Sequence, residues 1–277
     1  MAKIILKEVD KVEILTLQDN YVDLASQDGN DVVQRAMPLK GMDFANSILA
    51  EHGFSALVSI TCGDTVRTVL FDFGFSQTGA FENSKALNVD LSTIEMMALS
   101  HGHSDHTGGF KAMVEGIGQK GMKLVAHPAA FRKDRVIKIT EEFKIGMPKL
   151  EKEEIKAAGV DLIESKAPYP MLDEALWFLG GIPRKTEFEK GSAAFHYQEG
   201  GEEKWDAIDD DTSLVAHVRG KGLVILFGCA HAGIINTIEY AKEQTGVDAL
   251  FAVMGGFHLT GQEFAPIIEP TAMALKE

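Results

Sequence analysis

The chain has little cysteine and a deficit of positive charge. Its 277 residues include two cysteines, Cys62 and Cys229, and 27 Lys and Arg against 41 Asp and Glu, a formal net charge of −14. Two cysteines cannot form a disulfide framework or a four-thiolate zinc site, so we expect any metal to rest on His and Asp. The negative charge argues against nucleic acid as a partner, because proteins that bind its phosphates cluster positive charge.

Long apolar runs are also absent. No stretch approaches the roughly 18 apolar residues of a membrane-spanning helix. Lys3, Lys7 and acidic residues interrupt the apolar patch at the N-terminus, unlike a secretory signal peptide. We therefore expect a cytoplasmic protein without membrane contact. Hydrophobic residues make up 45% and charged residues 25%, as in globular proteins.

Runs rich in β-branched and aromatic residues predict strands in both halves of the chain. The predicted strands are 12–17, 54–61, 66–72, 94–100, 122–127, 212–220, 222–228 and 248–256. Helices are predicted at 107–118, at 150–159, from about 232 and within 264–276, with hairpins and long loops at about 165–210. Strands interspersed with helices favour a layered α/β protein over an all-β barrel.

The segment LSHGHSDHTGG, residues 99–109, places three histidines and one aspartate within six residues. His101 and His103 stand two residues apart where a strand ends, so both imidazoles can point to one side. Asp105 and His106 follow as the loop enters a helix, and their direction need not match the first pair. One loop can therefore supply two metal ions. The alternative, polar residues that only cap the helix, gives no reason for three histidines.

The ligand types narrow the identity of the metal. Neutral imidazole and carboxylate groups suit Zn²⁺, and also Mn²⁺ or Fe²⁺. We expect two zinc ions, although these ligand types do not exclude manganese or iron.

LSHGHSDHTGG resembles the signature of the metallo-β-lactamase-fold hydrolases. Other segments are similar to one branch, the 7,8-dihydropterin-6-methyl-4-(β-D-ribofuranosyl)-aminobenzene-5′-phosphate synthases and their relatives. They are AEHGFS (50–55), LFDFGFS (70–76), AHPAAF (126–131), GCAHAGIINTI (228–238) and GGFHL (255–259). The resemblance covers nearly the whole chain. It implies one domain over 1–277, a four-layer αββα sandwich of two mixed β-sheets flanked by helices, with the metals at the edge between the sheets.

The resemblance also assigns roles to the histidine loop. It implies that His101 and His103 hold the first metal, and that Asp105 and His106 hold the second. Asp72 matches a family aspartate that does not bind the metal itself but holds this loop in place. The alternative for Asp72 is an ordinary aspartate in a turn, but the orientation of metal ligands by hydrogen bonds favours the first role.

Further histidines follow other strands. His231 lies just past an apolar strand, at a position that the resemblance places at the metal centre as a ligand or close contact; the alternative is a histidine that only starts a helix. His258 follows two glycines, which permit close approach of the backbone to a ligand. We expect His258 to face substrate or transfer a proton. His127, before a proline, is interpreted as a structural residue at a strand end.

Weaker signals surround these residues. His52 belongs to the branch pattern and is expected either to reach the pocket or to be a packed structural histidine. Asp211, or its neighbour in the acidic run 209–211, resembles an acidic pair that completes a coordination sphere, against the alternative of a solvated turn. Gly108 and Gly109, at the start of a helix, are expected to leave N–H groups free for an anionic group.

The C-terminus departs from the family pattern. Members continue after the last helix into a strand that ends in a His-Cys-Thr-Gly segment, whose histidine reaches the second metal. This sequence ends at ALKE, residues 274–277, without that segment. Either the sequence is truncated, or another residue or subunit fills the place, or the second metal is held weakly.

These observations predict a dinuclear metallohydrolase that acts through a metal-activated hydroxide. Asp105 would position the hydroxide, and His231 or His258 would assist the leaving group or hold the oxyanion. We expect a small anionic substrate that bears phosphate or is related to pterin, including the synthase-type activity of the branch. The alternatives are a di-iron oxidoreductase, against which His103 argues because such relatives carry Glu there, and a metal-dependent sensor with little turnover. A homo-oligomer is left open.

Overall fold

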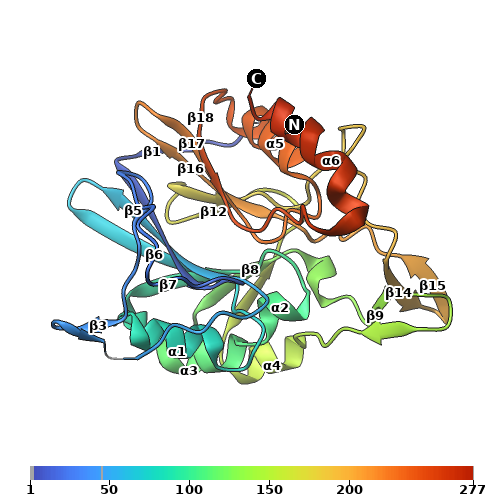
Figure 1. Cartoon of the computed structure of the whole chain (residues 1–277), viewed down its shortest axis with the longest axis horizontal. Helices are drawn as coiled ribbons and strands as arrows, with labels where there is room; N and C mark the ends of the chain where they lie inside the picture. The colour runs from blue at the N-terminus through green and yellow to red at the C-terminus, as the bar shows by residue number, and fades with distance from the viewer. Residues whose placement is uncertain (1–2, 45, 277) are drawn as a thin grey trace.

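Two six-stranded β-sheets lie face to face, with helices on their outer faces. Figure 1 shows this arrangement in the computed structural model, which describes residues 3–44 and 46–276. Both chain ends lie near each other, beside helix α6 (Gly261–Ala274).

The first sheet is mixed. Its spatial order is β11 (Asp161–Glu164), β8 (Lys123–Ala126), β7 (Ile94–Ala98), β6 (Thr65–Phe71), β5 (Ser55–Cys62) and β2 (Lys11–Gln18). The strands from β11 to β6 are parallel, whereas β5 and β2 are antiparallel to their neighbours. Its outer face is covered by α1 (Gly79–Ala86), α3 (Phe110–Ile117) and α4 (Lys152–Ala157). The short η1 (Leu91–Thr93) and α2 (Ser104–Thr107) lie between α1 and α3 in the chain.

The second sheet is mixed as well. Its spatial order is β12 (Tyr169–Met171), β13 (Leu176–Phe178), β16 (Ser213–Val218), β17 (Gly222–Phe227) and β18 (Leu250–Met254), with β1 (Glu8–Val9) parallel to β16. Strands β17 and β18 are also parallel, whereas β12 with β13, β13 with β16, and β16 with β17 pair antiparallel. Its outer face packs against α5 (Ile234–Thr245) and part of α6.

Alternation of side chains along the strands builds three apolar layers. On β6, Val69 and Phe71 pack between the two sheets, whereas Leu70 packs under the helices of the first sheet. On β17, Leu226 packs between the sheets and Ile225 packs under α5. Three layers of core between four layers of structure confirm the predicted αββα sandwich.

A third, smaller sheet projects from one side of the sandwich (Figure 1). Its order is β10 (Lys144–Gly146), β9 (Arg135–Lys138), β14 (Phe195–Glu199) and β15 (Glu202–Trp205). Hairpins were predicted at about 165–210, but the pairing of β14 with β9 joins segments far apart in sequence. The remaining short elements are η2 (Pro128–Phe131) and the hairpin of β3 (Leu39–Lys40) and β4 (Asp43–Phe44).

The predicted strands correspond to strands of the two large sheets, with shifts at their ends. The last helix begins earlier than predicted, at Gly261 instead of within 264–276. Thr260, in an extended conformation, precedes it, and Glu263 adds a favourable negative charge to its first turn. Among the helices of the described residues, none is long and apolar enough to cross a membrane.

We predict that Leu70→Ala lowers the free energy of unfolding by about 2–5 kcal/mol, because it opens a cavity in a fully buried position. Val66→Ala, on the same strand but 59% exposed, should cost less than about 1 kcal/mol. Urea denaturation monitored by circular dichroism measures both. Equal losses for the two variants would contradict the packing described.

Candidate metal centre

Loops from both sheets converge at one edge of the sandwich (Figure 1). The histidine loop follows β7 and leads into α2. Cys229 and His231 follow β17, and His258 follows the parallel neighbour β18. Parallel strands end at the same edge of a sheet, so residues distant in sequence meet here.

Three imidazole rings form the centre of this cluster. The ring centroids of His101 and His103 are 4.5 Å apart, and those of His101 and His231 are 4.8 Å apart. The Nε2 atoms of all three are buried without a hydrogen-bond partner among the described residues. Such atoms cost about 1–3 kcal/mol each when left unpaired, and together they suit a divalent metal such as zinc.

Donor atoms fall into three overlapping groups, each with its atoms within 4.8 Å of one another. They are His101–His103–Asp105, His101–Cys229–His231 and Asp105–His106–Cys229. The predicted ligands are therefore brought together, and His231 joins them from the other sheet. His101, Asp105 and Cys229 each belong to two groups, and of these the carboxylate and the thiolate are of a type that two ions can share.

The structure adds Cys229 to the His and Asp donors expected from the sequence. Cys229 Sγ lies 3.0 Å from Nε2 of His106. The available signal was the position of Cys229, directly after a buried strand and two residues before His231.

Burial keeps the central rings uncharged. It lowers the pKa of His103 to about 3, and the pKa values of His101 and His231 well below their usual range. Burial also lowers the pKa of His106, but Cys229, Asp105 and Asp72 outweigh it and raise that pKa well above its ordinary value. Uncharged imidazole is the form that binds metal.

Asp72 holds the histidine loop from behind. Its Oδ2 accepts a hydrogen bond from Nδ1 of His106 at 2.6 Å, and its Oδ1 accepts one from the Ser100 N–H at 2.7 Å. A carboxylate that accepts from Nδ1 directs Nε2 of His106 toward Cys229 and Asp105. The structure thus places Asp72 in contact with His106, a candidate ligand.

We predict that Asp72→Asn lowers zinc affinity by about 10–100-fold, because the amide no longer fixes the His106 ring as a carboxylate does. Competition with a chromophoric chelator measures the affinity. Asp64→Asn, at an exposed turn, should bind zinc as the unmodified protein does. Unchanged affinity in Asp72→Asn would contradict this role.

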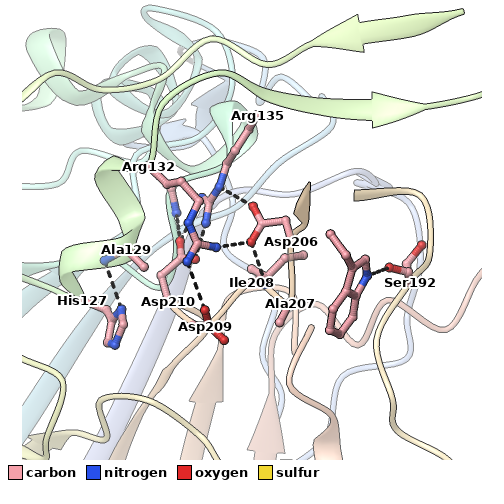
Figure 2. A network of polar contacts seen from close by, with 12 residues as sticks. His127, Ala129, Arg132, Arg135, Ser192, Asp206, Ala207, Ile208, Asp209 and Asp210 are labelled. Atoms are coloured by element: carbon pink, nitrogen blue, oxygen red, sulfur yellow. Dashed lines mark hydrogen bonds and ion pairs between the residues drawn. The ribbon is translucent and has the colours of Figure 1, made fainter. Parts of the chain in front are cut away.

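A second carboxylate, that of Asp210, holds the peptide between His101 and His103. Figure 2 shows Asp210 beside Arg135. Asp210 Oδ2 accepts a hydrogen bond from the Gly102 N–H at 2.7 Å and another from Nη1 of Arg135 at 3.0 Å. Burial raises the pKa of Asp210, but Arg135 and Gly102 outweigh it and lower that pKa to about 2. The acidic run is therefore mostly buried, and the small third sheet supplies the arginine that balances its charge.

Asp211 and His258 lie beside the donor groups but belong to none of them. Asp211 Oδ2 accepts a hydrogen bond from the Ala232 N–H, while its Oδ1 has no partner in the described chain. Burial raises the pKa of Asp211 to about 7. The His258 ring centroid lies 4.6 Å from that of His231, and its Nδ1 is buried without a partner.

Two side chains border the cluster. His52 is 73% exposed, and its Nε2 lies 3.3 Å from Oδ2 of Asp105, which places it at the mouth of the site. Phe195, on β14, stacks on His103 with ring centroids 5.1 Å apart.

The prediction that Gly108 offers a free N–H is wrong. That N–H donates to the carbonyl oxygens of Gly74 and Ser104. A Cβ on Gly108 would lie 1.7 Å from the Phe75 oxygen, and one on Gly109 would lie 2.2 Å from the Phe73 oxygen. These glycines therefore permit the histidine loop to pack closely against residues 73–75.

Loading the protein with Co²⁺ tests whether the Cys229 thiolate is a metal ligand. We predict that the protein loaded with Co²⁺ shows a thiolate-to-metal charge-transfer band, and that Cys229→Ser abolishes it. Cys62→Ser should retain the band, because Cys62 is exposed and outside the donor groups. A band that survives in Cys229→Ser would show that Cys229 is not a ligand.

Comparison with known proteins identifies relatives. A family model of the metallo-beta-lactamase superfamily matches residues 54–228. The chain is 30% identical over 276 residues to a 7,8-dihydropterin-6-methyl-4-(beta-D-ribofuranosyl)-aminobenzene-5'-phosphate synthase of Methanocaldococcus jannaschii, covering 98% of this chain and 85% of that protein. It is also 35% identical over 216 residues to an uncharacterized protein of the same archaeon. This match covers 76% of this chain and 74% of that protein. Among solved structures, Tm1679, a metal-dependent hydrolase of the beta-lactamase superfamily, matches with a TM-score of 0.66 and 23% sequence identity. The match covers 96% of this chain and 84% of that chain.

Proposed function

The chain belongs to the metallo-beta-lactamase superfamily, and from this premise we propose that it is a metal-dependent hydrolase with two divalent ions in its histidine cluster. The observation that carries the proposal is the convergence of three buried, unpartnered Nε2 atoms, those of His101, His103 and His231. A divalent ion bound between the three rings would offset the cost of burying these atoms. Zinc fits the mixture of imidazole, carboxylate and thiolate donors best.

The overlap of the donor groups supports two ions rather than one. The ring centroids of His101, His103 and His231 lie 4.5–4.9 Å apart around one position, and Asp105, His106 and Cys229 form a donor group at the other. Bound there, divalent ions would act as Lewis acids and lower the pKa of a water molecule toward neutrality. Asp105 and Cys229, shared between groups, would hold the two positions close together.

The residues around the donors would orient the reaction. His258 lies beside His231 but outside the donor groups, so its ring is available to exchange a proton with substrate. Burial lowers the pKa of His258, which leaves the ring uncharged at neutral pH. Phe195 covers the face of His103 and keeps water from that side. His52 lies at the open side, where a substrate would enter.

We infer a small anionic substrate that carries phosphate or is related to pterin. The support is the curated relative, whose product, by its name, is a dihydropterin joined to an aminobenzene ribofuranosyl phosphate. A screen of phosphoesters, lactones, thioesters and pterin precursors with the metal-loaded protein identifies the class of bond cleaved. Turnover restricted to neutral lactones would exclude the phosphate-bearing class.

Separate His103→Ala and Asp105→Asn variants test the metal centre itself. We predict that each loses bound metal and that phosphodiesterase turnover falls by about 10²-fold or more, because each variant removes a donor from the cluster. Elemental analysis and turnover are measured on the same samples. Lys111→Gln, exposed on α3, should match the unmodified protein. Retention of both metal and turnover by both variants would refute the proposal. Iron with O₂- or NO-dependent turnover would instead indicate an oxidoreductase.

A further inference from the structure

The connection between β15 and β16, residues 206–212, contacts both loops that carry the three central histidines. Two of its contacts reach the loop that follows β7. The Thr212 N–H donates to the carbonyl oxygen of Ser100 at 3.1 Å, and Asp210 Oδ2 accepts from the Gly102 N–H at 2.7 Å. The connection is thereby fixed to the peptide groups on either side of the first histidine.

Two further contacts fix the same connection to the loop that follows β17. Asp211 Oδ2 accepts a hydrogen bond from the Ala232 N–H at 2.7 Å. Nη2 of Arg184 donates both to the carbonyl oxygen of Ala207 and, at 3.0 Å, to that of His231. One side-chain nitrogen therefore links the connection to a residue whose ring belongs to the donor groups.

The connection has a backbone conformation that carries strain. Ile208 is buried and has a φ of 52°, in the left-handed region that β-branched residues rarely adopt. Its N–H donates to Oδ1 of Asp206 at 2.9 Å (Figure 2), and its carbonyl oxygen accepts from the Asp211 N–H at 3.0 Å. Such a conformation costs about 1–3 kcal/mol and persists only where the surrounding contacts enforce it. These contacts thus hold the connection in one shape.

Arg184 is held beside His231 by the two residues that follow it. The N–H groups of Lys185 and Thr186 donate to Oδ1 of Asn236 at 2.7 and 2.8 Å. Asn236 is buried in the first turn of α5, the helix that begins directly after the His231 loop. The guanidinium group therefore approaches the carbonyl oxygen of His231 from a segment that is anchored on this helix.

We propose that Arg184 is a positioning residue that fixes the separation between His231 and the pair His101 and His103. The ring centroids of these three histidines lie 4.5–4.9 Å apart, although they come from loops of different sheets. A metal position between them requires the rings to stay within roughly 0.5 Å of the binding geometry. The proposal rests on the function proposed above, because it assigns Arg184 to the same metal centre.

Substitutions of Arg184 and of its neighbour separate positioning from folding. Arg184→Met keeps an unbranched side chain but removes the donor to both carbonyl oxygens. Arg184→Lys keeps a cationic donor and should restore part of the effect. Lys185→Met is the matched control, because the Lys185 side chain is 61% exposed and pairs with Glu243.

Zinc affinity, measured by competition with a chromophoric chelator, tests the proposal in the full chain. We expect zinc binding to weaken about tenfold or more in Arg184→Met, to weaken less in Arg184→Lys and to stay within twofold in Lys185→Met. We also expect the ligand-field bands of the Co²⁺-loaded protein to shift in Arg184→Met, because these bands report the geometry of the donors.

Urea denaturation of the metal-free variants distinguishes positioning from a purely structural role. A lower free energy of unfolding in Arg184→Met, with zinc affinity and Co²⁺ bands unchanged, would overturn the proposal. Zinc affinity in Arg184→Lys no better than in a folded Arg184→Met would overturn it as well. Zinc affinities as expected, without hydrolysis of any compound by the unmodified protein, would contradict the proposed function alone.

Discussion

The hydrogen bond between Asp72 and His106 is the interaction on which the metal centre depends. Asp72 is fully buried at the end of β6, and it adopts a positive φ of 60° that brings its carboxylate under the histidine loop. One oxygen holds the Ser100 backbone and the other holds the His106 ring. Asp210 accepts a hydrogen bond from the Gly102 N–H and so holds the loop at a second point. Two buried carboxylates thus fix a loop that would otherwise have several conformations.

The sandwich makes this arrangement possible by bringing strand ends together. β7 belongs to the first sheet, whereas β17 and β18 belong to the second, and the apolar layer between the sheets sets their distance. The small third sheet adds Arg135 and Phe195 from outside the sandwich. Its arginine neutralises a buried aspartate, and its phenylalanine covers an imidazole. The site is therefore built by all three sheets.

The sequence predicted those parts of the molecule that depend on local pattern. Strand periodicity located the strands of both large sheets, and the spacing of His101, His103, Asp105 and His106 indicated a loop able to hold two ions. It did not predict the ion pair of Arg135 with Asp210 or the stacking of Phe195, because both depend on pairing between β9 and β14. The place of Cys229 among the donor groups depends on contact between the loop after β17 and the histidine loop, which belong to different sheets.

Anomalous X-ray diffraction at the zinc absorption edge, on crystals grown from protein supplied with zinc, tests the central claim most directly. The account predicts two peaks of divalent metal. One would be bounded by His101, His103 and His231, and the other by Asp105, His106 and Cys229. A cluster without a peak, in crystals grown from protein supplied with zinc, would contradict the account.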